Sequence, residues 1–188
     1  PLMLGLSALS GPFVRFVFGE AWAPTAPVLA VLAPVGALQT VTSTRGSLFM
    51  AVGRADVMLK WSLFANSVAV MSFAIGLNWG VVGVATCYLI ANIVMFYPAM
   101  WTLLHLVGHK ASDFLMRLAP VAVASLIMMA VVIFARTQME AQDWPDYWKI
   151  LACAPLGAIV YAGLISLFDR RAMLELVNLG RGFLPTAR

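Results

Sequence analysis

The chain has 188 residues, of which 62% are apolar and 11% charged, and its mean hydropathy is +0.92. This composition excludes an ordinary soluble domain, in which about 25% of residues are charged. The net charge of +4 does not indicate nucleic-acid binding, because the basic residues are spread over connectors and a tail and form no patch. The composition therefore predicts an integral membrane protein.

Five apolar stretches are long enough to cross a bilayer as helices. They are residues 24–52, 60–77, 81–104, 115–135 and 149–168. A membrane barrel is excluded, because its strands would alternate apolar and polar residues. Residues 1–18 start with an apolar stretch too short to span and lack a signal-peptide pattern, so they are predicted to be the end of a further helix, truncated at Pro1. The predicted fold is an all-α polytopic transmembrane helix bundle.

Three regions follow from these stretches. Residues 1–23 hold the truncated helix end and an outside connector, residues 24–168 form the five-helix transmembrane bundle, and residues 169–188 form a cytoplasmic basic tail. For the tail, a short interfacial helix on anionic lipid and a frayed end are both consistent with the sequence.

The distribution of basic residues predicts the orientation, because Lys and Arg favour cytoplasmic connectors. One side collects Arg54, Lys60, Lys110, Arg117, Arg170, Arg171, Arg181 and Arg188. The other side has Arg15, Arg136 and Lys149, together with Glu20, Glu140, Asp143, Asp146 and the aromatic residues Trp144, Tyr147 and Trp148. This asymmetry predicts a cytoplasmic carboxyl terminus and an aromatic anchor at the outer interface.

The sequence offers no constellation for membrane-embedded catalysis, which would need an activated nucleophile, paired carboxylates or clustered metal ligands. His105 and His109 are four residues apart at a helix end and are interpreted as interfacial residues. All acidic residues lie in predicted connectors or the tail. Cys87 and Cys153 lie among apolar residues and are interpreted as packing residues. We therefore expect no enzyme, no cofactor and no metal.

A polar constellation lies in the stretch that follows Pro24. Gln39, Thr42 and Arg45 cover about 120° of a helix surface, and Ser43 lies beside them. Arg45 is roughly 12 Å from the predicted membrane boundary, so its charge either faces a cavity or snorkels outward. A guanidinium in a cavity wall would make paired hydrogen bonds to a phosphate or carboxylate.

Further polar and helix-perturbing residues accompany this constellation. Ser62, Asn66 and Ser67 either face the same interior or form hydrogen bonds between helices, and packing is the favoured interpretation. Asn66 is retained as a candidate for the substrate path. Residues 78–80 predict a tight turn between two spans, and Pro34, Pro98, Pro120 and Pro155 predict bends in or near spans.

Several motifs occur in a fixed order along residues 10 to 110. They are Phe18-Gly19-Glu20-Ala21-Trp22, Ala26-Pro27-Val28-Leu29, Arg45-Gly46-Ser47-Leu48, Ala51-Val52-Gly53-Arg54, and Gly76-Leu77-Asn78-Trp79-Gly80-Val81-Val82-Gly83-Val84-Ala85 with Tyr88. In this order they resemble the carboxyl-terminal half of polysaccharide-export flippases, which belong to the multidrug/oligosaccharidyl-lipid/polysaccharide exporter superfamily. The subgroup that looks most similar handles exopolysaccharide or O-antigen units.

The resemblance implies a transporter of about fourteen helices in two lobes, which moves undecaprenyl-diphosphate-linked oligosaccharides from the inner to the outer leaflet of a bacterial plasma membrane by alternating access. It implies that Arg45 contacts the diphosphate or an acidic sugar. The expected partners are membrane lipid, the lipid-linked anionic oligosaccharide, the missing amino-terminal lobe and the polysaccharide polymerase machinery, with no nucleic acid. This chain would be a fragment of such a protein.

Two alternatives stay open on the sequence. A drug or metabolite antiporter of the same superfamily would share the helical plan but would be expected to use intramembrane carboxylates, which are not visible here. A non-transporting membrane assembly subunit would be an incomplete gene product that binds a partner in the membrane.

Overall fold

The computed structural model describes residues 1–43, 49–50, 53–106, 111–142 and 144–168. These residues are almost entirely helical and contain no strand, which confirms the predicted all-α fold. In chain order the elements are α1 (Leu2–Ala8), α2 (Ser10–Phe18), the 3-10 helix η1 (Glu20–Thr25), α3 (Ala26–Thr42), α5 (Ala55–Gly76), the 3-10 turn η2 (Leu77–Trp79), α6 (Gly80–Leu106), α7 (Ala111–Glu140) and α8 (Asp146–Phe168).

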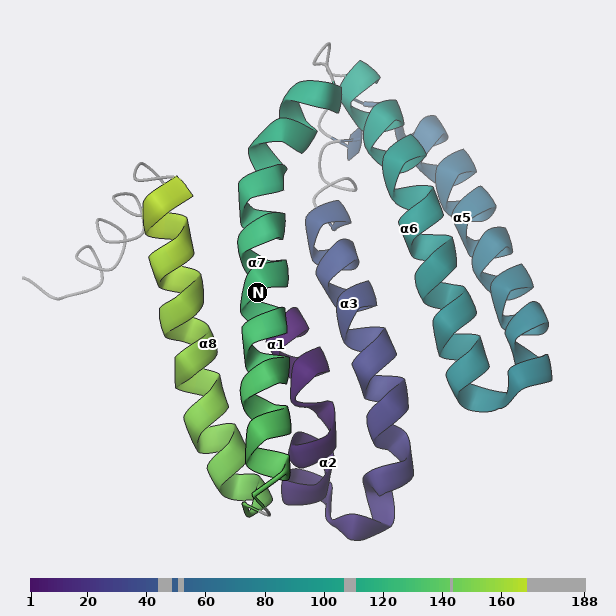
Figure 1. Ribbon diagram of the computed structural model, residues 1–188. Coiled ribbons are helices and arrows are strands. Elements are labelled where there is room, and N and C mark those ends of the chain that lie inside the picture. The colour runs from purple at the N-terminus through teal and green to yellow at the C-terminus, as the bar shows by residue number, and fades with distance from the viewer. Residues whose placement is uncertain (44–48, 51–52, 107–110, 143, 169–188) are drawn as a thin grey trace, which may run out of the picture.

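The long helices alternate in direction across the bundle (Figure 1). The segments with the length and hydropathy of membrane spans are Glu20–Thr42, Ala55–Thr102, Leu118–Glu140 and Asp146–Leu167. The second of these contains both α5 and α6, which turn back at η2 and lie side by side (Figure 1). The predicted polytopic bundle is therefore confirmed. The first predicted span is described as far as α3, and residues 44–48 lie outside the described part of the chain.

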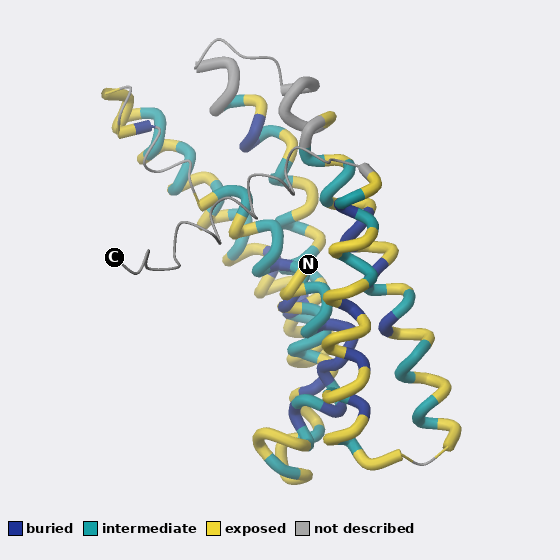
Figure 2. Tube along the Cα trace, turned by 90° about the vertical axis from the view of Figure 1, so that its left-hand side faces the viewer, coloured by how far each residue is buried: buried dark blue, intermediate teal, exposed yellow. Residues whose placement is uncertain are grey.

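Much of the helix surface is exposed (Figure 2), and many of the exposed residues are large and apolar. Leu63 and Val70 on α5, Ile93 on α6 and Ile159 on α8 are each more than half exposed. Contiguous apolar surface of this extent is rare on soluble proteins and is normal where lipid or another protein segment covers the helices. The exposed faces thus fit a chain that spans a membrane several times.

Residues 1–18 were predicted to be the end of one helix. They are helical, but the structure divides them into two helices, α1 and α2, which meet at Leu9. Pro12 has no N–H, so the carbonyl of Ala8, one turn earlier, loses its helical donor. The Nη1 of Arg136 on α7 donates to that carbonyl at 2.7 Å. Ala8 and Leu9 also pack in a buried apolar cluster with residues of α7 and α8, among them Cys153. The break is therefore held by α7 and α8.

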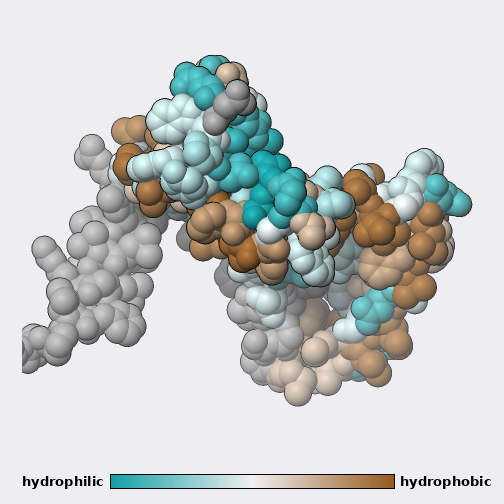
Figure 3. Space-filling model, turned by 90° about the horizontal axis from the view of Figure 1, so that it is seen from below, coloured by the Kyte–Doolittle hydropathy of each residue, from teal (hydrophilic) through white to brown (hydrophobic). Residues whose placement is uncertain are grey.

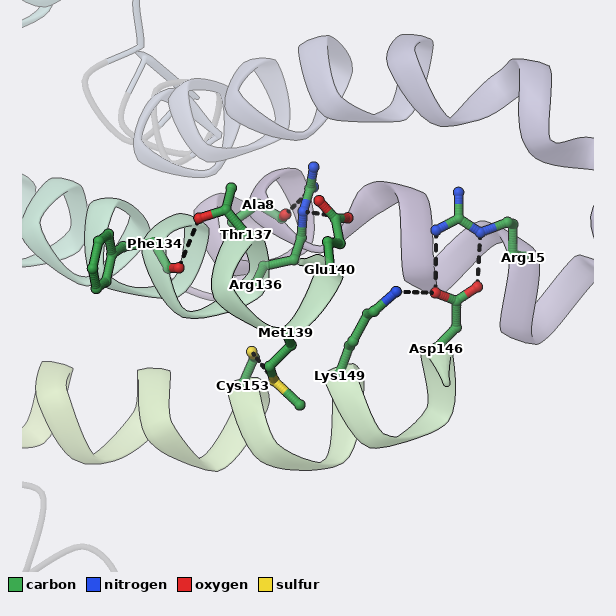
Figure 4. Close-up of polar contacts among 10 residues, drawn as sticks. All are labelled: Ala8, Arg15, Phe134, Arg136, Thr137, Met139, Glu140, Asp146, Lys149 and Cys153. Carbon is green, nitrogen blue, oxygen red and sulfur yellow. Dashed lines mark hydrogen bonds and ion pairs between the residues drawn. The ribbon is translucent and has the colours of Figure 1, made fainter. Parts of the chain in front are cut away.

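Three ion pairs lie close together at the lower end of the bundle in Figure 1 (Figure 4). One of them joins α2 to α8, and the other two lie within α7 and within α8. The guanidinium of Arg15 donates to Asp146 through Nε at 2.7 Å and Nη2 at 3.1 Å. The buried Lys149 donates to the same carboxylate at 3.2 Å. The Nε of Arg136 lies 3.1 Å from Oε1 of Glu140. The hydrogen bond to Asp146 raises the pKa of Arg15, so this guanidinium stays charged.

The ion pairs show how the two ends of the bundle differ. All three cations that were predicted to lie outside are at this end, and each is paired with a carboxylate. Viewed from this end, hydrophilic residues gather over α2, α7 and α8, whereas the side formed by α5 and α6 is largely apolar (Figure 3). Arg54 precedes α5 and therefore lies at the opposite end. Among the described residues, Arg15, Arg136 and Lys149 thus lie at one end and Arg54 at the other, as predicted. Lys110 and the predicted basic tail at residues 169–188 lie outside the described residues, and the assignment of one side to the cytoplasm stays a prediction.

The hairpin of α5 and α6 depends on glycine at a close approach. Gly80 has a φ of +71°, in the left-handed region that glycine adopts without strain. A Cβ on Gly76 would lie 2.5 Å from the Cα of Val84, so the two helices meet backbone to backbone. The tight turn predicted at residues 78–80 is confirmed as η2.

The ion pair between α2 and α8 yields a stability prediction. Asp146→Asn removes the carboxylate that two cations share and leaves the buried Lys149 without its partner. We expect the free energy of unfolding to fall by about 2 to 3 kcal/mol, measured by thermal unfolding of the detergent-solubilised protein. Asp56→Asn is the matched control, because the pair of Asp56 with Arg54 is exposed and screened by solvent and is expected to contribute little to stability. Equal losses in both variants would contradict this role.

Candidate functional site

A half-open polar groove of about 190 Å³ lies between α3, α5 and α6. Its described lining mixes amide, phenol and indole groups with small and apolar side chains. The lining residues are Leu38, Gln39, Thr42, Trp61, Ala65, Asn66, Val68, Ala69, Tyr88, Ala91, Asn92, Met95, Phe96 and Ala99. Charged side chains are absent from this described lining.

Helical periodicity explains why these residues meet. On α6, Tyr88, Asn92, Met95 and Ala99 follow one another at intervals of three or four residues and therefore share a face. Trp61, Ala65 and Ala69 on α5 follow the same rule. The small side chains of Ala65, Ala69 and Ala99 leave the volume of the groove free, and the larger polar side chains surround that volume.

Hydrogen bonds fix the polar wall of the groove. Nε2 of Gln39 on α3 donates to the hydroxyl oxygen of Tyr88 on α6 at 2.9 Å. The ring of Phe73 packs on that of Tyr88 with centroids 5.1 Å apart. Nδ2 of Asn92 donates to the backbone carbonyl of Tyr88 at 2.8 Å. Asn66 also lines the groove, and its amide makes no hydrogen bond to another described residue, so its donors and acceptors are available.

The structure brings three of the sequence-derived candidates together, because Gln39, Thr42 and Asn66 all line the groove. Ser43 is not among the lining residues, and its hydroxyl donates to the carbonyl of Thr40 in its own helix at 2.8 Å. Arg45 lies outside the described residues. A role of these residues in a substrate path stays a prediction.

Sequence reasoning missed Trp61 and Asn92 and used Tyr88 only as part of a motif. Asn92 carried a usable signal, since an amide in the middle of the apolar stretch 81–104 is costly unless it faces protein or water. Tyr88 lies one helical turn before Asn92, so the two residues share a helix face, and the sequence could have identified that face as polar. Trp61 lies at the start of a span, where an interfacial anchor is the ordinary interpretation of tryptophan.

The described residues contain no cluster of His, Cys, Asp and Glu able to hold a metal ion. Cys87 and Cys153 are both free thiols in this structure. The described lining of the groove offers hydrogen bonds and apolar contact.

Comparison with known proteins gives the relatives of this chain. It is 26% identical over 182 residues to the teichuronic acid biosynthesis protein TuaB of Bacillus subtilis, covering 96% of this chain and 38% of that protein. It is 28% identical over 188 residues to the succinoglycan biosynthesis transport protein ExoT of Rhizobium meliloti, covering all of this chain and 38% of that protein. It is 38% identical over 95 residues to the lipopolysaccharide biosynthesis protein WzxC of Escherichia coli, covering 50% of this chain and 19% of that protein.

The chain is a relative of bacterial polysaccharide biosynthesis and transport proteins. This confirms the resemblance to polysaccharide-export proteins that the ordered motifs indicated. The chain spans 38% of the length of two of these relatives. No family model matches it, and no solved structure matches it.

The groove yields a prediction about water access. In a protein whose native cysteines are replaced by alanine, Asn66→Cys should react with a charged, water-soluble maleimide in open membrane vesicles, because thiolate formation needs water. Val94→Cys is the control, since Val94 is exposed on α6 outside the groove lining and is expected to face lipid. The expected ratio of labelling rates is at least tenfold. Equal rates at the two positions would contradict a water-filled groove.

Proposed function

We propose that this chain is part of a membrane transporter that moves lipid-linked oligosaccharide units across a bacterial plasma membrane for polysaccharide biosynthesis. The observation that carries the proposal is the similarity over nearly the whole chain to two polysaccharide biosynthesis proteins, one of them named as a transport protein. A helix bundle with several candidate spans fits that role, and the polar groove supplies a surface for a hydrophilic cargo.

The proposed cargo is an undecaprenyl-diphosphate-linked oligosaccharide that passes from the cytoplasmic to the outer leaflet by alternating access. In this scheme α3, α5 and α6 form one wall of a central cavity, and the rest of the transporter forms the other. Arg45 is proposed to contact the diphosphate, because a guanidinium makes paired hydrogen bonds to phosphate and stays charged in a poor dielectric. The carboxyl terminus is proposed to be cytoplasmic.

A test compares the gene product carrying this sequence with its Arg45→Ala and Arg45→Lys variants in a strain that lacks the gene. Loss of the gene should abolish the surface polysaccharide and leave the lipid-linked precursor in the inner leaflet. We expect Arg45→Ala to restore less than about a tenth of the polysaccharide, and Arg45→Lys to restore an intermediate amount, since a lysine keeps a cation but loses the paired geometry. Protein levels are matched by immunoblot.

Two results would contradict parts of this proposal. Unchanged surface polysaccharide in the strain without the gene would exclude the transport function in that pathway. Full activity of both Arg45 variants would leave the transport function standing and would show that Arg45 does not contact the cargo.

A further inference from the structure

We propose that the groove between α3, α5 and α6 is the subsite for one uncharged sugar ring of the transported oligosaccharide. This inference rests on the proposed transport function and names the part of the cargo that the described residues recognise. The diphosphate would then be bound elsewhere in the cavity.

The groove presents hydrogen-bond donors and acceptors in similar numbers. Gln39 uses one N–H on Tyr88, which leaves its carbonyl oxygen as an acceptor and the hydroxyl of Tyr88 as a donor. Asn92 uses one N–H on the backbone of its own helix and keeps its carbonyl oxygen and a second N–H. Asn66 keeps its whole amide. A sugar hydroxyl both donates and accepts, so it can bond with such a mixed wall, whereas an anionic group accepts only.

The charge of the described lining also favours a neutral group. None of its residues carries a formal charge at neutral pH. In a partly dehydrated site within a membrane, an anionic group held only by these uncharged side chains would lose its hydration without gaining a countercharge from the described lining. A neutral polar ring would lose only hydrogen bonds to water, and the amides replace these.

The remaining walls suit the C–H surface of a sugar ring. Trp61 contributes an indole, and Met95 and Phe96 contribute further apolar surface on α6. A volume of about 190 Å³ corresponds to roughly six water molecules at about 30 Å³ each. That space is comparable with a single pyranose, and the open side of the groove leaves room for the rest of the oligosaccharide unit. The groove thus combines an amide wall, an apolar wall and the size of one ring.

Asn66 offers the sharpest test, because its amide has no described protein partner to lose. Asn66→Leu keeps the approximate size and removes every hydrogen bond, so transport should fall about tenfold. Asn66→Gln keeps an amide with its donors and acceptors, so it should retain at least half of wild-type transport. Asn66→Lys is the opposite probe and should transport poorly; transport at or above the wild-type level would overturn the proposal in favour of an anionic cargo group.

The assay measures surface polysaccharide and the leaflet distribution of the lipid-linked precursor in the strain without the native gene. Protein levels and melting temperatures are matched among the variants. Ser67→Ala is the control, since Ser67 is the next residue on α5, lies outside the groove lining and donates its hydroxyl to the carbonyl of Leu63. It should transport as the wild type does.

Failure of both Asn66→Leu and Asn66→Gln would overturn the proposal in favour of a purely steric contact. Wild-type transport by Asn66→Leu would also overturn it, because the groove would then not bind the cargo. In both cases the transport function would stand, since it fails only if the strain without the gene still makes its polysaccharide.

Discussion

Polar side chains within the spanning helices must find hydrogen bonds inside the protein or in water, and this constraint organises the structure. The helices satisfy it locally for most of their hydroxyl groups, which donate to a carbonyl three or four residues earlier in the same helix. Such hydroxyls belong to Thr40, Ser43, Ser67, Ser72, Thr86, Thr102, Ser125 and Ser166. These residues are thereby compatible with lipid or tight packing and mark no site.

Amide groups are too rich in donors and acceptors to be satisfied in this way. Gln39, Asn66 and Asn92 come from three different helices, and all three line the same groove. Gln39 and Asn92 both bond to Tyr88, one to its hydroxyl and the other to its backbone carbonyl, so this residue joins the polar wall together. Unsatisfied hydrogen-bonding capacity is thus gathered where the helices leave space, which is the physical reason to regard the groove as the site.

The ion pairs at the lower end of the bundle serve a different purpose. They hold the broken helix of α1 and α2 against α7 and α8, where Ser7 also donates to the carbonyl of Ala30 and so joins α1 to α3 at 2.6 Å. The α5 and α6 hairpin packs mainly through α6 on α3, away from these ion pairs (Figure 1). The groove therefore lies where the α5 and α6 hairpin packs on α3, at a distance from the ion-paired part of the bundle.

The sequence predicted the helical class and the approximate spans, because apolar length determines these features directly. It also singled out Gln39, Thr42 and Asn66, which the structure brings to one groove, while their role in a substrate path stays a prediction. It could not predict the break at Leu9, which depends on Arg136, far along the chain, as the donor to a carbonyl freed by Pro12. It could not pair Gln39 with Tyr88 either, since that contact requires the mutual placement of α3 and α6. Asn66 was interpreted as a packing residue for the same reason.

Site-specific photo-crosslinking would show whether cargo passes along the groove. A photoreactive amino acid at Met95, within the lining, and another at Ile93, exposed on the same helix outside the lining, would be irradiated with radiolabelled lipid-linked oligosaccharide in membranes. We expect the photoreactive group at Met95 to form an adduct with the saccharide. At Ile93 we expect either no adduct or attachment to the lipid chain. Saccharide adducts of equal yield at both positions, or at neither, would contradict passage of cargo along the groove.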